Sequence, residues 1–202
     1  MKKPFVISIS GISGSGKTTL SKILKEILSN SAVIHFDKIP LDMLGKDYCE
    51  WSESGADCNE WNLSPITDEI KRLLSAPVDY IIVDYPFGKS HKEVCVYLDF
   101  AVWVDIPLDI ALTRRVIRDF TCRDVTRHPL KGNVIDEITA NLSLYLTRHR
   151  DTYFRHISTV KPFVDLVVDG TKSPMEIADE VIIEYDIQLS GESDMIKERA
   201  YH

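Results

Sequence analysis

The sequence predicts an α/β fold in which a parallel sheet is covered by helices on both faces. Two observations carry this prediction. Short runs rich in β-branched residues alternate with segments whose apolar residues have helical spacing, and such alternation is typical of parallel sheets. In addition, a glycine-rich loop separates the first predicted strand from the first predicted helix. The length of 202 residues favours one compact domain, because a domain takes roughly 150 residues.

The first half of the chain contains three of the predicted strands. Each is a short apolar run, and the first is bounded by Pro4 and Gly11. Ser64 and Pro65 mark the start of the second helix, because serine and proline are frequent at helix N-termini. The predicted elements are a strand at 5–10, a helix at 18–29, a strand at 32–36, a helix at 64–74 and a strand at 78–83.

The second half contains two more strands. Pro107 suits the first turn of a helix, Gly170 follows the last strand, and Ser173-Pro174 begins the last helix. We expect one domain over residues 1–188, followed by a polar tail at 189–202. The predicted elements are a strand at 100–104, a helix at 107–120, a helix at 134–156, a strand at 163–168 and a helix at 173–182.

The composition argues against several classes of protein. Asp and Glu outnumber Lys and Arg by 31 to 24, and the net charge of −7 argues against broad nucleic-acid binding, which depends on neutralising phosphates. No run approaches the roughly 18 apolar residues of a membrane span. The four cysteines show no C-x-x-C spacing. This favours reduced thiols and a cytoplasmic location.

The strongest functional signal is the segment 11–18, which fits the pattern G-x-x-x-x-G-K-[ST] at every fixed position. In this phosphate-binding loop (P-loop), backbone N–H groups and the helix N-terminus surround phosphate oxygens. Lys17 is expected on the β- and γ-phosphates of ATP, and Thr18 on Mg²⁺. Asp84 is the second predicted metal ligand, with turn formation as the alternative. The predicted phosphate-binding residues are Gly11, Ser13, Gly14, Ser15, Gly16, Lys17, Thr18, Thr19 and Arg114.

Among proteins that use nucleoside triphosphates, a small kinase fits the chain best. The guanine-binding pattern Asn-Lys-x-Asp is absent, and Asp84 and Gly88 are one residue too far apart for the Asp-x-x-Gly of a GTPase. A kinase needs a group that orients or deprotonates the acceptor hydroxyl. Asp37 follows the second predicted strand, and ligands of open α/β sheets bind at the carboxyl ends of strands. We therefore predict Asp37 as the catalytic base, with helix capping as the alternative.

Arginines are concentrated in one segment of the chain. Some of them share a face of the predicted helix, and the others continue into a polar connection. We predict an arginine-bearing lid over about residues 118–133, in which Arg118 and Arg123 stabilise the transferring phosphoryl group. The alternative for some of these residues is a solvated helix face with weak ion pairs. The arginines are Arg114, Arg115, Arg118, Arg123 and Arg127.

These motifs resemble those of the uridine kinase and phosphoribulokinase-type group of P-loop kinases, which includes the nicotinamide riboside kinases. The resemblance runs from residue 5 to about 186. It depends on the P-loop, on Asp37 and on residues 113–119, which are similar to an Arg-Arg-x-x-Arg-Asp lid helix. It implies a three-layer P-loop NTPase fold with a five-stranded parallel sheet in the order 2-3-1-4-5. It also implies Asp37 as base, Asp84 near Mg²⁺, adenine near residues 170–173, and lid contacts from Arg114, Arg118 and Arg123.

The chain departs from the uridine kinase pattern on the acceptor side. Asn62 stands where the family has an aspartate that holds ribose hydroxyls, and residues 75–77 are too few for the family's base-recognising hairpin. For the aromatic residues near this side, hydrophobic cover of the sheet is the alternative to stacking on a substrate. The predicted acceptor-binding residues are Asp37, Trp61, Asn62, Tyr85, Phe87 and His91.

The sequence thus predicts an ATP- and Mg²⁺-dependent kinase that transfers the γ-phosphate to a hydroxyl, with a nucleoside 5′-hydroxyl as the first candidate. The alternatives are a kinase for another small alcohol, such as a vitamin precursor or a sugar acid, and a non-catalytic ATP-binding regulatory protein. The expected partners are ATP and a small-molecule acceptor, without nucleic acid or membrane. The sequence leaves open whether the chain forms a homodimer.

Overall fold

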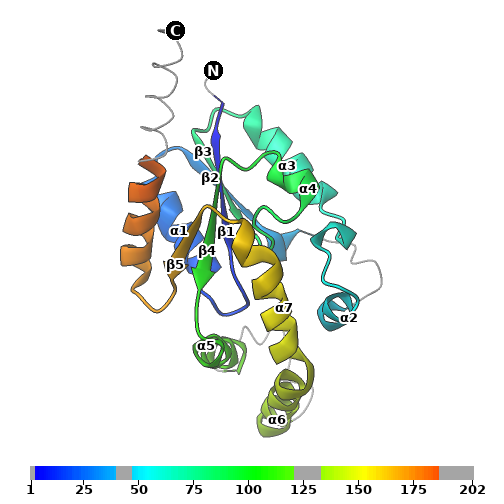
Figure 1. Cartoon of the computed structure of the whole chain (residues 1–202). Coiled ribbons are helices and arrows are strands. Elements are labelled where there is room, and N and C mark those ends of the chain that lie inside the picture. Colours follow the sequence, from blue (N-terminus) through cyan, green and yellow to red (C-terminus); the bar gives the residue numbers. More distant parts are fainter. Residues whose placement is uncertain (1–2, 40–46, 121–132, 187–202) are drawn as a thin grey trace.

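A five-stranded parallel sheet forms the centre of the computed structural model, which describes residues 3–39, 47–120 and 133–186 (Figure 1). The strand order is β2-β3-β1-β4-β5, and all neighbouring strands run parallel. The predicted α/β fold and the predicted strand order are therefore confirmed. The strands are β1 (Phe5–Ser10), β2 (Ser31–His35), β3 (Tyr80–Asp84), β4 (Phe100–Asp105) and β5 (Leu166–Asp169).

Both faces of the sheet are buried, and each face has its own hydrophobic cluster. On β1, Val6 belongs to one cluster, whereas Ile7 and Ile9 belong to the other, and all three side chains are fully buried. This division follows from the strand geometry, because successive side chains point to opposite faces. Burial on both faces also explains why the strands appear as near-continuous apolar runs in the sequence.

One face is covered by α1 (Lys17–Ile27) together with residues 174–186, which form the orange helix at the left of Figure 1. Leu24 of α1 and Val181 meet in the same cluster. The opposite face packs against segments that contribute to the other cluster. The helices there are α2 (Tyr48–Glu53), α3 (Ser64–Leu74), α4 (Lys92–Cys95), α5 (Leu108–Phe120) and α7 (Arg150–Val160).

The structure differs from the sequence predictions at two places in its second half. The single helix predicted for 134–156 is instead α6 (Val134–Leu144), a π-helical segment (Tyr145–His149) and α7, which continues to Val160. The last strand begins at Leu166 rather than at residue 163, because residues 161–163 form a 3-10 turn that contains Pro162. Most of the predicted lid, residues 121–132, and the predicted tail, 189–202, lie outside the described residues.

The cap of α2 depends on side chains that the sequence analysis did not use. Asp47 accepts a hydrogen bond from the backbone N–H of Glu50, and the Glu50 side chain accepts one from the N–H of Asp47. This reciprocal capping box stabilises a helix of only six residues. Within the described part of the chain, no helix is long and apolar enough to span a bilayer.

A pair of substitutions on α1 tests the buried cluster on its side of the sheet. Leu24 is fully buried, whereas Ile27 is 41% exposed on the same helix. We expect Leu24→Ala to lower the free energy of unfolding by about 2–5 kcal/mol, because the change leaves a cavity. Ile27→Ala should cost well under about 1 kcal/mol. Urea unfolding followed by circular dichroism measures both, and equal losses would contradict this packing.

Candidate active site

A cavity of about 870 Å³ lies at the carboxyl ends of β1, β2 and β3. Each of these strands continues directly into residues of its wall, and α1, α2, α5 and α7 contribute the other lining residues. The placement agrees with the general position of ligands in open α/β sheets. The lining residues are Gly11, Ile12, Ser13, Gly14, Gly16, Lys17, Thr18, Thr19, Phe36, Asp37, Tyr48, Asp84, Tyr85, Pro86, Arg114, Arg118, Asp119, Tyr153 and His156.

The P-loop lies between β1 and α1, and it packs tightly against α5. Gly14 and Gly16 have positive φ values of 88° and 102°, which favour glycine. A Cβ on Gly14 would lie 2.3 Å from the carbonyl oxygen of Ala111, whereas a Cβ on Gly16 would meet nothing within 4 Å. The predicted phosphate-binding residues of the loop line the cavity, except Ser15, which is buried.

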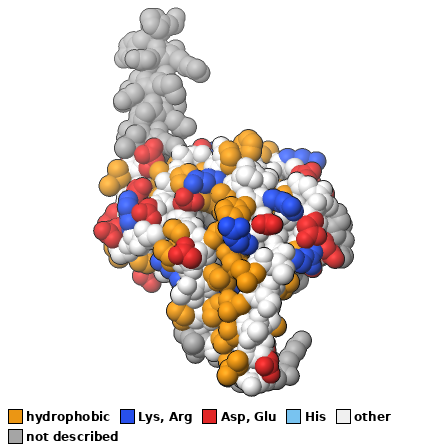
Figure 2. Space-filling view, turned by 60° about the horizontal axis from the view of Figure 1, so that its bottom comes forward, with side chains coloured by type: hydrophobic (Ala, Val, Ile, Leu, Met, Phe, Trp, Pro, Cys, Tyr) orange, Lys and Arg blue, Asp and Glu red, His pale blue; other side chains and the backbone are white. Residues whose placement is uncertain are grey.

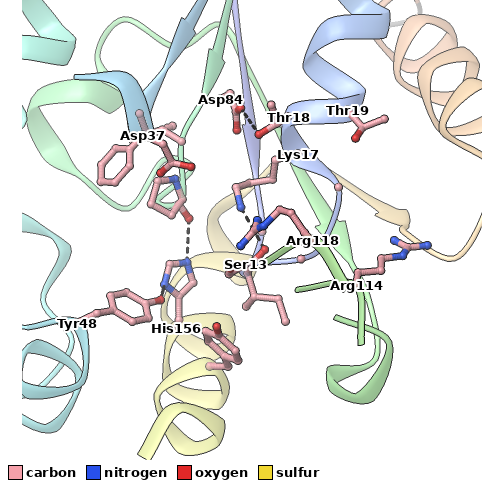
Figure 3. Close-up of a pocket in the computed structure, with 18 of the residues that line it drawn as sticks. Ser13, Lys17, Thr18, Thr19, Asp37, Tyr48, Asp84, Arg114, Arg118 and His156 are labelled. Carbon is pink, nitrogen blue, oxygen red and sulfur yellow. Dashed lines mark hydrogen bonds between the residues drawn. The ribbon is translucent and has the colours of Figure 1, made fainter. Parts of the chain in front are cut away.

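Lys17 points into the cavity from the first turn of α1 (Figure 3). Its ammonium group donates a hydrogen bond to the carbonyl oxygen of Ile12 at 3.1 Å. Burial lowers the pKa of Lys17, while the negative charges of Asp84 and Asp37 oppose this effect. The two carboxylates therefore help to keep a buried lysine charged, as contact with phosphates requires.

Asp84 and Thr18, the two predicted metal ligands, are in direct contact. The Thr18 hydroxyl donates a hydrogen bond to Oδ2 of Asp84 at 2.7 Å, and Nδ1 of His35 lies 3.0 Å from the same oxygen. Among the described residues, no group of three or more His, Cys, Asp and Glu side chains could hold a metal by itself. One carboxylate beside one hydroxyl fits Mg²⁺ instead, because this ion takes hard oxygen ligands and shares them with phosphates and water.

Asp37 lies in the short 3-10 helix Phe36–Lys38 that directly follows β2. The N-cap of this helix is His35 rather than Asp37. The carboxylate faces the cavity near Lys17 in Figure 3, and its charge acts on both Lys17 and Arg118. The structure thus brings the predicted base and the P-loop to one cavity.

The arginines of α5 divide between two environments. Arg114 and Arg118 line the cavity; Nη1 of Arg114 donates to the Gly170 carbonyl at 3.0 Å, and Nε of Arg118 donates to Asp119 at 2.7 Å. The hydrogen bond to Asp119 and the nearby charge of Asp37 raise the pKa of Arg118.

Arg115 is buried, and its guanidinium donates to the Tyr153 hydroxyl at 3.1 Å and to Asn141 at 2.8 Å. Arg123 and Arg127 lie outside the described residues.

Of the predicted acceptor-binding residues, Asp37 and Tyr85 line the cavity, whereas the other four do not. Asn62 accepts hydrogen bonds from the backbone N–H and the hydroxyl of Ser64 at the start of α3. Phe87 is fully buried, Trp61 packs on the same cluster, and Nε2 of His91 bonds the Trp61 carbonyl at 3.0 Å. Trp61 and Phe87 thus pack in the hydrophobic cluster on this face of the sheet, and their role toward a substrate stays a prediction.

The sequence analysis missed several residues that form the wall on the side of Asp37: Phe36, Tyr48, Tyr153 and His156. His156 is fully buried; its Nε2 bonds the Pro86 carbonyl at 2.9 Å, and its Nδ1 bonds the Tyr48 hydroxyl. The three-residue spacing of Tyr153 and His156 on a predicted helix was a usable signal, because it places both on one face. Tyr48 gave no such signal, because no element was predicted around it.

The close approach of the P-loop to α5 can be tested with two glycine substitutions. Gly14→Ala and Gly16→Ala share the strain of a positive φ, about 1–2 kcal/mol. Only Gly14→Ala also forces a methyl group onto the Ala111 carbonyl. We expect its melting temperature to fall below that of Gly16→Ala by about 3 °C or more. Thermal unfolding without nucleotide measures both, and equal melting temperatures would contradict the contact.

The state of the His156 ring is a second test. Burial lowers the pKa of His156 from 6.5 to about 4, and the charge of Lys17 acts in the same direction, against the hydrogen bond to Pro86. We expect ¹⁵N NMR at pH 6 to show a neutral ring protonated at Nε2, with loss of the signal in His156→Gln confirming the assignment. A midpoint near 6.5 would contradict the burial.

The same pKa difference makes His156 a source of acid instability. Well above pH 6.5 the ring is neutral in both the folded and the unfolded chain, and its contribution is constant. Between pH 6.5 and about 4 the unfolded chain binds the proton first, so the free energy of unfolding falls by up to about 1.4 kcal/mol per pH unit.

No family model matches the chain. The uridine kinase of Borrelia garinii subsp. bavariensis is 27% identical over 187 residues, which cover 81% of this chain and 85% of that protein. The uridine kinase of Clostridium botulinum is 24% identical over 194 residues, which cover 83% and 89%.

Solved structures show the same architecture. A possible uridine kinase from Bacillus stearothermophilus superposes with a TM-score of 0.51 at 17% identity, over 84% of this chain and 90% of that one. Shikimate kinase from Aquifex aeolicus gives a TM-score of 0.51 at 18% identity, over 93% and 99%. The chain therefore has the fold of the P-loop kinases, and the resemblance to the uridine kinase group that its motifs predict is confirmed.

Proposed function

We propose that this protein is an ATP- and Mg²⁺-dependent kinase that transfers the γ-phosphate to a hydroxyl of a small molecule, with a nucleoside 5′-hydroxyl as the first candidate. The observation that carries the proposal is the single cavity that contains both the P-loop and Asp37. The similarity to proteins named uridine kinase supports the choice of acceptor. The free thiols of Cys49, Cys58 and Cys95 support a cytoplasmic location.

The donor end of the site would be built from the P-loop and α5. Backbone N–H groups of residues 13–18 would surround the phosphates, and Lys17 would contact the β- and γ-phosphates. Thr18 and Asp84 would hold Mg²⁺, which neutralises charge on the phosphates when bound. Arg114, which donates a hydrogen bond to the Gly170 carbonyl, would position ATP next to the segment where adenine is expected.

In the transfer step, Asp37 accepts the proton of the acceptor hydroxyl as that oxygen forms a bond to the γ-phosphorus. The bond between the γ-phosphorus and the bridging oxygen breaks, and ADP leaves with the electron pair. Lys17 and Arg118 face the same space and stabilise the charge on the transferring group. Arg123, beyond the described residues, is a further cation that we propose for the lid.

The base can be tested by measuring ADP release with Mg²⁺ and ATP against nucleosides, sugars and hydroxy acids. We expect Asp37→Asn to lower kcat about 10²- to 10⁴-fold, because the amide cannot take the proton. ATP affinity should stay near that of the original chain. Asp68→Asn is the matched control, because the Asp68 side chain is 70% exposed on α3 and pairs with Lys71 of the same helix.

Two results would contradict the proposal in different ways. ATP binding without stimulation by any acceptor, in the presence of Mg²⁺, would favour a non-catalytic ATP-binding protein. Acceptor-dependent turnover that is unchanged in Asp37→Asn would keep the kinase and remove Asp37 as its base. Chelation of Mg²⁺ should abolish the turnover of the original chain and of every variant that is active.

A further inference from the structure

The cavity has two ends with different chemistry. In Figure 3, Thr19 and Arg114 lie on one side of Lys17, and Asp37, Tyr48 and His156 lie on the other. The first side contains the P-loop and belongs to the phosphate donor. The second is thus the place for the acceptor, and neither Tyr48 nor His156 has a role in the transfer step.

The protons of Tyr48 and His156 can be assigned from their partners. The Pro86 carbonyl can only accept, so Nε2 of His156 carries a proton and donates to it at 2.9 Å. Burial keeps the pKa of His156 low, so its ring is neutral and Nδ1 has only a lone pair. The Tyr48 hydroxyl must therefore donate its single proton to Nδ1. Burial raises the pKa of Tyr48 well above its usual value, so this proton stays in place.

A tyrosine oxygen that already donates its proton to one partner can only accept further hydrogen bonds. Tyr48 and His156 both line the cavity, so the hydroxyl that joins them borders it and its remaining lone pairs can meet a ligand. The Asp37 carboxylate on the same side is also an acceptor. Tyr48 and Asp37 thus offer lone pairs on the side of the cavity assigned to the acceptor substrate. These lone pairs favour a substrate that presents hydroxyl or N–H groups.

The charges point the same way. The cations that line the cavity, among the described residues, are Lys17, Arg114 and Arg118, whereas His156 is uncharged at neutral pH. Arg118 is bonded to Asp119, and Arg114 lies on the donor side. A substrate carboxylate placed beside Asp37 and Tyr48 would meet a like charge and oxygen lone pairs, which disfavours hydroxy acids at that position.

The position of Tyr48 is held by contacts on several sides. Its ring stacks on Trp51, with centroids 5.2 Å apart and planes 24° apart. α2 itself is joined to the π-helical segment, because Arg148 donates to the Glu53 carboxylate at 3.1 and 3.2 Å. Phe36 adds an aromatic wall nearby and packs edge-on against Phe87. A hydrogen-bond acceptor that is held rigidly beside an aromatic wall suits a substrate that is a neutral, ring-bearing polyol.

We propose that Tyr48, oriented by His156, is a specificity-determining residue that accepts a hydrogen bond from a hydroxyl of the acceptor substrate. It selects neutral polyols such as the ribose of a nucleoside over hydroxy acids. This role rests on the proposed kinase function, but it can be measured through binding alone.

The test compares Tyr48→Phe with the original chain by calorimetry, in the presence of Mg²⁺ and a non-hydrolysable ATP analogue. The ligands are a ribonucleoside, its 2′- and 3′-deoxy analogues and a cyclic hydroxy acid. Phenylalanine keeps the ring stacked on Trp51 and removes only the oxygen. We expect ribonucleoside affinity to fall about 5- to 100-fold, the loss from one hydrogen bond to a buried group. Affinity for the ATP analogue should not change.

The sharper readout is selectivity. The original chain should bind the ribonucleoside more tightly than at least one deoxy analogue, and Tyr48→Phe should bind the two about equally. Tyr185→Phe is the matched control, because it removes a tyrosine hydroxyl bonded to Tyr80 far from the cavity lining. Unchanged ATP-analogue binding in both variants shows that they are folded.

Three results would overturn the role of Tyr48. They are tighter binding of the hydroxy acid than of the nucleoside, full deoxy discrimination in Tyr48→Phe, and no binding of any nucleoside. Failure of the kinase function itself looks different: nucleosides bind with the expected selectivity, yet no acceptor stimulates ADP release.

Discussion

The contact between the P-loop and α5 is the constraint on which the rest of the site depends. The loop can approach the Ala111 carbonyl only because residue 14 has no Cβ. This approach sets α5 against the loop, so that Arg114 and Arg118, three and seven residues beyond Ala111 on one helix face, reach the same cavity as Lys17. One backbone contact thus brings these three cations to one cavity.

The arrangement of charge follows from that contact. Burial of Lys17 would favour its neutral form, and Asp84 and Asp37 oppose this from two neighbouring strand ends. Asp84 is itself bonded by Thr18 and His35, so its position is determined by β2, β3 and α1 together. Cations and carboxylates therefore share one cavity, and Phe36, Tyr48 and Tyr153 add aromatic rings to its wall.

Much of the fold and the donor side could be predicted because the signals are local. The strands are apolar runs, the P-loop is a contiguous motif, and Asp37 and Asp84 each occur at or directly after a strand end. The acceptor side could not be predicted in this way. Four of the predicted residues lie in loops near the cavity, but their side chains pack into the core or toward α3. These residues are Trp61, Asn62, Phe87 and His91.

By itself, the sequence determined the five strands and the longer helices between them, the phosphate-binding loop and the carboxylates at the strand ends, because each depends on residues adjacent in the chain. Only the tertiary structure decided which side chains form the cavity wall beside Asp37. Tyr48 and His156 are 108 positions apart, and they meet because α2 and α7 pack against the same face of the sheet. Such a pairing depends on long-range packing, which no local pattern of residues records.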